Sequence, residues 1–298
     1  MFFRRGDSRD SGDKGNLNLE YLKMLRVLEW IKFFAPIPLI GAILAHATPF
    51  ILISVGVIFF CVIAFGFVVN NYFDVEIDLR NTKKVMRGNN PLSSGRITKR
   101  GTFALMCVLL ATAITLACFL SPGISGVLFT LLCISLLTLY SVNYIRLKER
   151  FIVDILTHGL MFGLFPVLAG FTLADGDLNL NLNLNLNLNL NTHILLIAAL
   201  FMIIGCESLL THQINDYEGD LGYSNTTVVK VGLKKGWVLL ASVVLLSIAI
   251  LELIVHYFDI GLVLHSAAVA YLIAYPFYTC RNRNELQSVI NTYSCTGW

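Results

Sequence analysis

The sequence predicts an all-α, polytopic membrane protein. Of its 298 residues, 56% are hydrophobic and only 14% are charged, and the mean hydropathy is +0.72. Soluble domains usually carry about 25% charged residues, so this composition excludes a soluble domain. We count eight apolar runs of the length that a helix needs to cross a bilayer, about 20 residues. They lie at residues 30–47, 50–72, 101–121, 124–143, 152–173, 193–213, 236–256 and 260–279.

The positions of lysine and arginine predict how these spans are oriented. The 22 basic residues lie in the N-terminal tail and the start of the first span, at 80–100, at 146–150, at 230–235, and at Arg281 and Arg283. The alternate loops, near residues 48, 122, 174–192 and 258, contain none. By the positive-inside rule, the N-terminus and the loops after spans two, four and six are expected in the cytoplasm. The net charge of +3 therefore reflects membrane orientation, and we expect no nucleic-acid partner.

The chain is expected to divide into three parts. A disordered cytoplasmic tail occupies residues 1–20, a transmembrane domain residues 21–280, and a short C-terminal tail residues 281–298. Within the domain, residues 177–191 alternate strictly between leucine and asparagine after Asp177. We interpret this segment as a repeat expansion that an external surface loop tolerates. Its period of two would also suit a strand that pairs with another segment.

Two acidic motifs follow apolar runs on the predicted cytoplasmic side. They are DVEID at residues 74–78 and DYEGD at residues 216–220. In each motif two aspartates are four residues apart, so on a helix they share one face, and like charges at this spacing destabilise the helix unless they are neutralised. Mg²⁺ is typically bound by one or two carboxylates together with substrate phosphates. The sequence therefore predicts diphosphate chemistry, with Mg²⁺ ligands at Asp74, Asp78, Asp216 and Asp220.

Polar side chains near the motifs are further candidates for the site. Asn70 lies on the face of Asp74, one turn earlier. His212 takes the place of Asn70 when the two motifs are aligned. Glu207, in the sixth span, needs a polar partner or a neutral form because a buried charge is costly. We therefore expect His212 and Glu207 to line a cavity.

The segment LYSVNYIRLKER follows the fourth span. It places Tyr140 at the cytoplasmic end of that span, with Arg146, Lys148 and Arg150 just beyond. We interpret Arg146 and Arg150 as anchors of the positive-inside kind. Lys148 is the better candidate to meet a phosphate, as a point charge.

These motifs resemble those of the UbiA superfamily of intramembrane aromatic prenyltransferases and their archaeal lipid-forming relatives. NNYFDVEID is similar to the family's first motif, Asn-Asp-x-x-Asp-x-x-x-Asp, with Asn71 where the family usually has aspartate. DYEGDLGYSNTTVVKVG is similar to the second motif, and YSVNYIRLK to the Tyr-Ser and Lys segment after the fourth helix. The resemblance covers residues 22–280. The family commonly has nine spans, one more than we count.

The resemblance implies a bundle of transmembrane helices around a central cavity that the two motif loops cap on the cytoplasmic side. The implied reaction is Mg²⁺-dependent transfer of a prenyl group from an allylic polyprenyl diphosphate to a hydrophobic acceptor in the membrane, either an aromatic ring or an isoprenoid glycerol lipid. It implies catalytic roles for Lys148, Tyr140 and Asn70. Lys148 would also contact the diphosphate. Weaker candidates for diphosphate binding lie in the loop after the first motif: Arg87, Arg96 and Lys99.

Two other function classes use acidic residues in membranes. A cation transporter would bind its ion at repeated acidic motifs, but such sites lie near the middle of the membrane. Here the motifs lie at helix ends beside basic residues that repel cations. A CDP-alcohol phosphotransferase would need Asp-Gly followed by Ala-Arg and further aspartates in one stretch, which this chain lacks. The prenyltransferase hypothesis is therefore preferred, with the transporter as the alternative.

Overall fold

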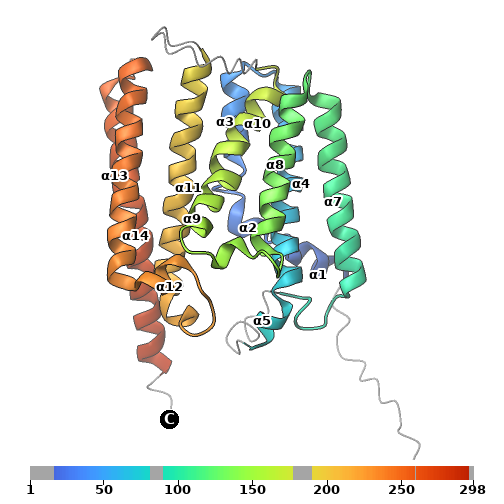
Figure 1. Cartoon of the computed structure of the whole chain (residues 1–298), viewed down its shortest axis with the longest axis vertical. Helices are drawn as coiled ribbons and strands as arrows, with labels where there is room; N and C mark the ends of the chain where they lie inside the picture. Colours follow the sequence, from blue (N-terminus) through green and yellow to red (C-terminus); the bar gives the residue numbers. More distant parts are fainter. Residues whose placement is uncertain (1–16, 81–89, 177–189, 259, 295–298) are drawn as a thin grey trace, which may run out of the picture.

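The computed structural model describes residues 17–80, 90–176, 190–258 and 260–294, and all regular structure in these ranges is helical (Figure 1). This confirms the predicted fold class. The helices are α1 (Leu17–Met24), α2 (Val27–Trp30), α3 (Pro36–Leu44), α4 (Pro49–Phe73), α5 (Val75–Arg80), α7 (Lys99–Leu120), α8 (Ile124–Ser141), η1 (Leu147–Glu149), α9 (Val153–Gly159), η2 (Leu160–Leu164), α10 (Phe165–Leu173), α11 (Leu190–Asp220), α12 (Thr227–Val231), α13 (Leu233–Phe258) and α14 (Leu262–Ser294).

Seven helices or helical units in the described ranges are long and apolar enough to cross a membrane. They correspond to the second to eighth predicted spans, and α9, η2 and α10 together form one of them. Local sequence explains where the helices begin. Thr48 and Thr98 cap α4 and α7, where their side chains accept hydrogen bonds from the amides of Ile51 and Gly101. Such caps satisfy amides that have no partner within the helix.

The predicted span at residues 30–47 is not one helix. It contains Trp30, the last residue of α2, then turns at residues 31–35 and then α3, which follows α2 along the bundle (Figure 1). Proline cannot continue a helix because it lacks an N–H group and clashes with the preceding turn, but it is favourable at a helix start, and α3 begins at Pro36. Trp30, which ends α2, is fully buried and donates to the carbonyl of Leu25 at 2.7 Å.

Glycines allow two close helix contacts. A Cβ atom at Gly170 of α10 would lie 1.8 Å from the carbonyl oxygen of Pro38, so only glycine lets α3 approach α10 this closely. Likewise, a Cβ atom at Gly163 of η2 would lie 2.2 Å from the carbonyl oxygen of Phe201 on α11. Small residues at interfaces are typical of helix packing in membranes, where dispersion rather than a hydrophobic driving force holds helices together.

The polar connections that follow the motifs gather at one end of the bundle. In Figure 1, α5, α12 and α1 lie at the same end, opposite the end at which α3 and α4 meet. This arrangement places both acidic motifs at one membrane surface. That this surface is the cytoplasmic one stays a prediction from the basic residues.

Several predicted boundaries can be compared with the helices. The leucine–asparagine segment falls outside the described residues, except for its last two residues, which begin α11. Of the predicted N-terminal tail, residues 1–16 also fall outside them, whereas α1 starts at Leu17. Helix α14 continues to Ser294, beyond the predicted end of the domain at residue 280. The division into three parts stays a prediction.

Candidate active site

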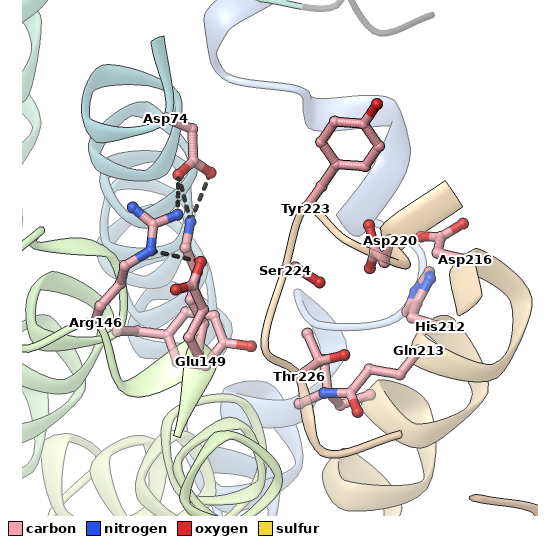
Figure 2. A pocket seen from close by; sticks show the side chains of 13 residues that line it. Asp74, Arg146, Glu149, His212, Gln213, Asp216, Asp220, Tyr223, Ser224 and Thr226 are labelled. Carbon is pink, nitrogen blue, oxygen red and sulfur yellow. Dashed lines mark hydrogen bonds and ion pairs between the residues drawn. The ribbon is translucent and has the colours of Figure 1, made fainter. Parts of the chain in front are cut away.

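A polar pocket of about 190 Å³ lies between the ends of α4 and α11. Figure 2 shows Asp74, Arg146 and Glu149 on one side, and His212, Asp216 and Asp220 on the other. The chain between Asp220 and α12 runs between the two sides. The lining residues are Asp74, Tyr140, Arg146, Lys148, Glu149, Leu209, His212, Gln213, Asp216, Asp220, Tyr223, Ser224 and Thr226.

Asp74 is the centre of the first side. Its two carboxylate oxygens each accept a hydrogen bond from Nζ of Lys148 at 2.6 Å, and Oδ1 also accepts from Arg146 at 3.1 Å. Lys148 donates further to Oδ1 of Asn70 at 2.8 Å, so Asn70 orients the ammonium. Arg146 is in turn paired with Glu149 at 2.7 Å. The side chains of Asp74, Lys148 and Arg146 are each only 15% exposed, so solvent screens these ion pairs weakly.

Lys148 lies on η1, between the spans, and its surroundings act on its charge in opposite directions. Burial lowers the pKa of the Lys148 ammonium, because removal from water disfavours the charged form. The adjacent Asp74 carboxylate opposes this effect by favouring the ammonium. The contacts of the ammonium with both oxygens of Asp74 join the two side chains in one ion pair.

The two aspartates of the first motif do not share one pocket. Helix α4 ends at Phe73, and although the amide of Asp78 still donates to the carbonyl of Asp74 at 2.8 Å, the axis changes between α4 and α5. The carboxylate of Asp78 accepts from Nδ2 of Asn90 at 3.0 Å and is not among the pocket-lining residues. Within the described residues, Asp78 therefore lies outside the pocket as a partner of Asn90.

The second side of the pocket is formed by the last turns of α11. Asp216 and Asp220 lie on a continuous helix, with His212 one turn before them, and all three line the pocket. Four carboxylates and two basic side chains line it in total, an excess of two negative charges with histidine neutral. No three side chains of metal-ligand type come together among the described residues. A metal ion here would need substrate oxygens to complete its coordination, as Mg²⁺ commonly does.

Of the remaining predicted site residues, only some lie at the pocket in the part of the chain that the structure describes. Tyr140 lines the pocket, and its ring lies 6.5 Å from that of His158, deeper in the bundle. Glu207 is buried in α11 and is not among the residues that line this pocket, so its place at a cavity stays a prediction. Arg96 is exposed and forms an ion pair with Glu20 at 2.9 Å, and Lys99 is exposed at the start of α7, so neither lies at this pocket. Arg87 lies outside the described residues.

Asn71, the departure from the family's first motif, faces away from the pocket. It is 3% exposed, and its Nδ2 donates to the carbonyl of Met24 at 3.3 Å. The side chain therefore helps to hold the end of α1 against α4. An aspartate at this position would point at a carbonyl oxygen rather than at a metal ion.

Sequence reasoning missed several lining residues. Arg146 was interpreted as an anchor, yet it pairs with Asp74 across a sequence separation of 72 residues. Its position two residues before Lys148 was the one available indication. The other lining residues without a predicted role carry no local sequence pattern that marks them: Glu149, Leu209, Gln213, Tyr223 and Ser224. Thr226 lies within the stretch that resembles the family's second motif.

Fold and pocket together define a helical membrane protein with a pocket, lined by acidic and basic side chains, at one end of its bundle. The sequence profile of the UbiA prenyltransferase family matches residues 34–292. The chain belongs to the UbiA prenyltransferase family and is a prenyltransferase. The matched region includes both acidic motifs and continues along α14, and this membership favours the enzyme over the cation transporter.

Curated relatives and a solved structure are similar to this chain over most of its length. The chain is 27% identical over 265 residues to a digeranylgeranylglyceryl phosphate synthase from Methanobrevibacter smithii, covering 86% of each chain. It is 26% identical to the synthase of the same name from Methanosphaera stadtmanae, covering 80% of this chain and 79% of the relative. The fold is similar to that of a UbiA homolog from Archaeoglobus fulgidus bound to GPP and Mg²⁺, with a TM-score of 0.68, 18% identity, and 89% and 87% of the two chains covered.

Proposed function

We propose that this prenyltransferase moves a prenyl group from an allylic polyprenyl diphosphate to a hydrophobic acceptor in the membrane, and that the reaction requires Mg²⁺. The observation that carries the proposal is the charge of the pocket. An excess of two negative charges would repel a diphosphate. One divalent cation, held by these carboxylates, would cancel that excess and so favour the binding of a diphosphate. The proposal is supported by the structures of the Archaeoglobus fulgidus homolog bound to GPP and Mg²⁺ and to DMAPP and Mg²⁺.

Asp74 on one side, and Asp216 and Asp220 on the other, are the residues that would hold Mg²⁺. The ion, when bound, stabilises the negative charge that develops on the leaving diphosphate. Lys148 and Arg146 now donate hydrogen bonds to Asp74. Both can instead donate to the oxygens of the leaving diphosphate, which gain negative charge as the bond breaks. The C–O bond of the allylic diphosphate breaks with its electron pair on oxygen. The acceptor then bonds to the allylic carbon and releases a proton.

A group of aromatic side chains behind Tyr140 suits the carbon chain. The ring of Tyr140 borders the pocket, and behind it His158 and Phe162 lie with ring centres 4.7 Å apart. Phe34 stacks on Phe162 at 4.2 Å. Aromatic faces attract cations, and an apolar wall excludes water that would quench an allylic cation. We therefore place the allylic carbon between the charged residues and this aromatic group.

For the acceptor, we propose an isoprenoid glycerol phosphate lipid. The support is the identity of the curated relatives, both named digeranylgeranylglyceryl phosphate synthase and both matched over most of their length. An aromatic ring is the other acceptor class. Purified protein incubated with geranylgeranyl diphosphate and each acceptor in turn would distinguish them by the prenylated product.

Release of diphosphate from geranylgeranyl diphosphate tests the reaction itself. We expect wild-type release to depend on Mg²⁺, and Asp74→Ala and Asp216→Ala to lower it by about 100-fold or more, the usual effect of removing one group that stabilises the transition state. Glu76→Ala and Glu218→Ala are matched controls, because these exposed acids lie in the same two motifs. Unchanged release in both aspartate variants would show that the pocket is not the active site.

A further inference from the structure

A fully buried carboxylate lies beside the pocket without lining it. Asp154, in the first turn of α9, is 0% exposed. Its Oδ2 accepts from Nε2 of Gln213 at 2.7 Å and from the amide of Thr227 at 2.8 Å. Its Oδ1 accepts from the amide of Ile155 at 2.9 Å and from the hydroxyl of Thr227. An ionised carboxylate offers about four acceptor positions, and here four donors occupy them.

These hydrogen bonds join three distant parts of the chain. Oε1 of Gln213 accepts from the amide of Val228 at 3.0 Å, so Gln213 connects α11 to the start of α12. Oγ1 of Thr227 accepts from the amide of Ile152 at 2.7 Å, which connects α12 to the segment after Lys148. Ile152 has φ of +64°, a conformation that a β-branched residue seldom adopts and that needs such support.

The connected loop, residues 221–226, supplies one wall of the pocket. It begins after Asp220, the end of α11, and ends at Thr227. Figure 2 shows Tyr223, Ser224 and Thr226 along it, between the two charged sides. The hydroxyl oxygens of Ser224 and Thr226 are buried and have no hydrogen-bond partner in the part of the chain that the structure describes. Buried polar atoms are nearly always satisfied, so these two hydroxyls indicate a bound group that the chain itself does not supply.

We propose that Asp154 is a positioning residue, which holds loop 221–226 against the pocket so that Ser224 and Thr226 donate hydrogen bonds to oxygens of the substrate diphosphate. This inference rests on the proposed function, since it takes the diphosphate to bind between the two acidic motifs. Gln213, on α11, helps to hold the loop through its hydrogen bonds with Asp154 and with the amide of Val228. The two hydroxyls supply neutral donors on the side of the pocket where Asp216 and Asp220 would otherwise repel phosphate oxygens.

A purely stabilising role for Asp154 makes a different prediction from a positioning role. If the buried hydrogen bonds only stabilise the fold, their loss lowers the melting temperature and leaves the KM for the diphosphate unchanged. If they position the loop, their loss has the same effect on KM as removal of the two hydroxyls. The two changes together then have no larger effect than either alone, because residues that act through one another are not additive.

The test compares Asp154→Asn, the double variant Ser224→Ala/Thr226→Val, and the combination of all three substitutions. We expect Asp154→Asn and the double variant each to raise the KM for geranylgeranyl diphosphate by about tenfold, the loss of roughly one charge-assisted hydrogen bond. The combination should show about the same rise. In Asp154→Asn, hydrogen exchange at the amides of residues 221–228 should become faster, and the double variant should keep the wild-type melting temperature.

Thr172→Val is the matched control, because Thr172 is also buried but donates within α10, to the carbonyl of Leu168 at 2.8 Å. If Asp154→Asn does not fold, Thr227→Val, which keeps the amide donor, replaces it. A rise in KM that multiplies in the combination, or one confined to the acceptor substrate, would overturn the proposal. Absence of Mg²⁺-dependent diphosphate release by the wild type would instead reject the proposed function, and hydrogen exchange would still report whether Asp154 holds the loop.

Discussion

Lys148 is expected to compete with Mg²⁺ for Asp74, and its removal should strengthen metal binding in the absence of substrate. In the structure its ammonium contacts both oxygens of the Asp74 carboxylate at 2.6 Å. A metal ion that binds these oxygens must displace the ammonium. In Lys148→Met this obstacle is gone, while the length of the side chain is retained.

The structure sets the size of the effect. A hydrogen bond to a charged group contributes about 1.5–3 kcal/mol, and Asp74 and Lys148 are each 15% exposed, so little is lost to solvent screening. Displacement of the ammonium should therefore weaken Mg²⁺ binding by about 10- to 100-fold, at about 1.4 kcal/mol for each factor of ten. Arg146 still contacts Asp74 in the variant, which keeps the gain toward the lower end of this range.

Isothermal titration of Mg²⁺ into the protein without diphosphate measures this gain. We expect Lys148→Met to bind Mg²⁺ about 10- to 100-fold more tightly than the wild type, and Asp74→Asn/Lys148→Met to lose the gain. Lys99→Met is the control, since Lys99 is an exposed lysine away from the pocket. With diphosphate present, Lys148→Met should lower turnover by about 10²–10³-fold. Equal Mg²⁺ affinity in Lys148→Met and the wild type would refute the competition.

Three further predictions concern residues outside the charged pair. Asn71→Asp should destabilise the protein by about 1–3 kcal/mol in thermal unfolding, because its carboxylate would face the Met24 carbonyl, and should not raise Mg²⁺ affinity. Arg96→Gln should leave the KM for the diphosphate within about twofold of wild type, since Arg96 pairs with Glu20. A tenfold rise in KM would show that Arg96 contacts the diphosphate. Gly163→Ala should cost about 1–3 kcal/mol through overpacking, whereas Gly56→Ala, whose Cβ would lie 3.8 Å from Leu39, should be tolerated.

The spans could be predicted because a long apolar run is a local property of the sequence. The exception, residues 30–47, shows the limit of that reasoning. Hydropathy does not register Pro36, which starts a new helix, or the close approach of Pro38 to Gly170. The placement of both motifs at one end of the bundle followed from counting the spans between them. Hydropathy and span count therefore predicted the architecture. The break between α2 and α3 depends instead on the backbone properties of proline and glycine.

The individual site residues were less predictable, because their roles depend on partners far along the chain. Asp74 and Asp78 are equivalent in sequence, yet one faces Lys148 and the other Asn90. Asn71 departs from the family pattern, but its side chain contacts α1, across a separation of 47 residues. Residue type indicated which side chains can bind a metal or a phosphate, and only the packing of α1, α4 and α5 determined which of them face the pocket.

The segment between α8 and α9 connects the two acidic motifs. Lys148 bonds to Asp74 at the end of α4, and six residues later Asp154 bonds to Thr227, just beyond the second motif. Both contacts span more than 70 residues of sequence. The sequence marked Lys148 by its charge, but Asp154 stands in an apolar span without a motif of its own. A shift of this segment would move both walls of the pocket together, so substitutions at its two ends should be coupled although the side chains do not touch.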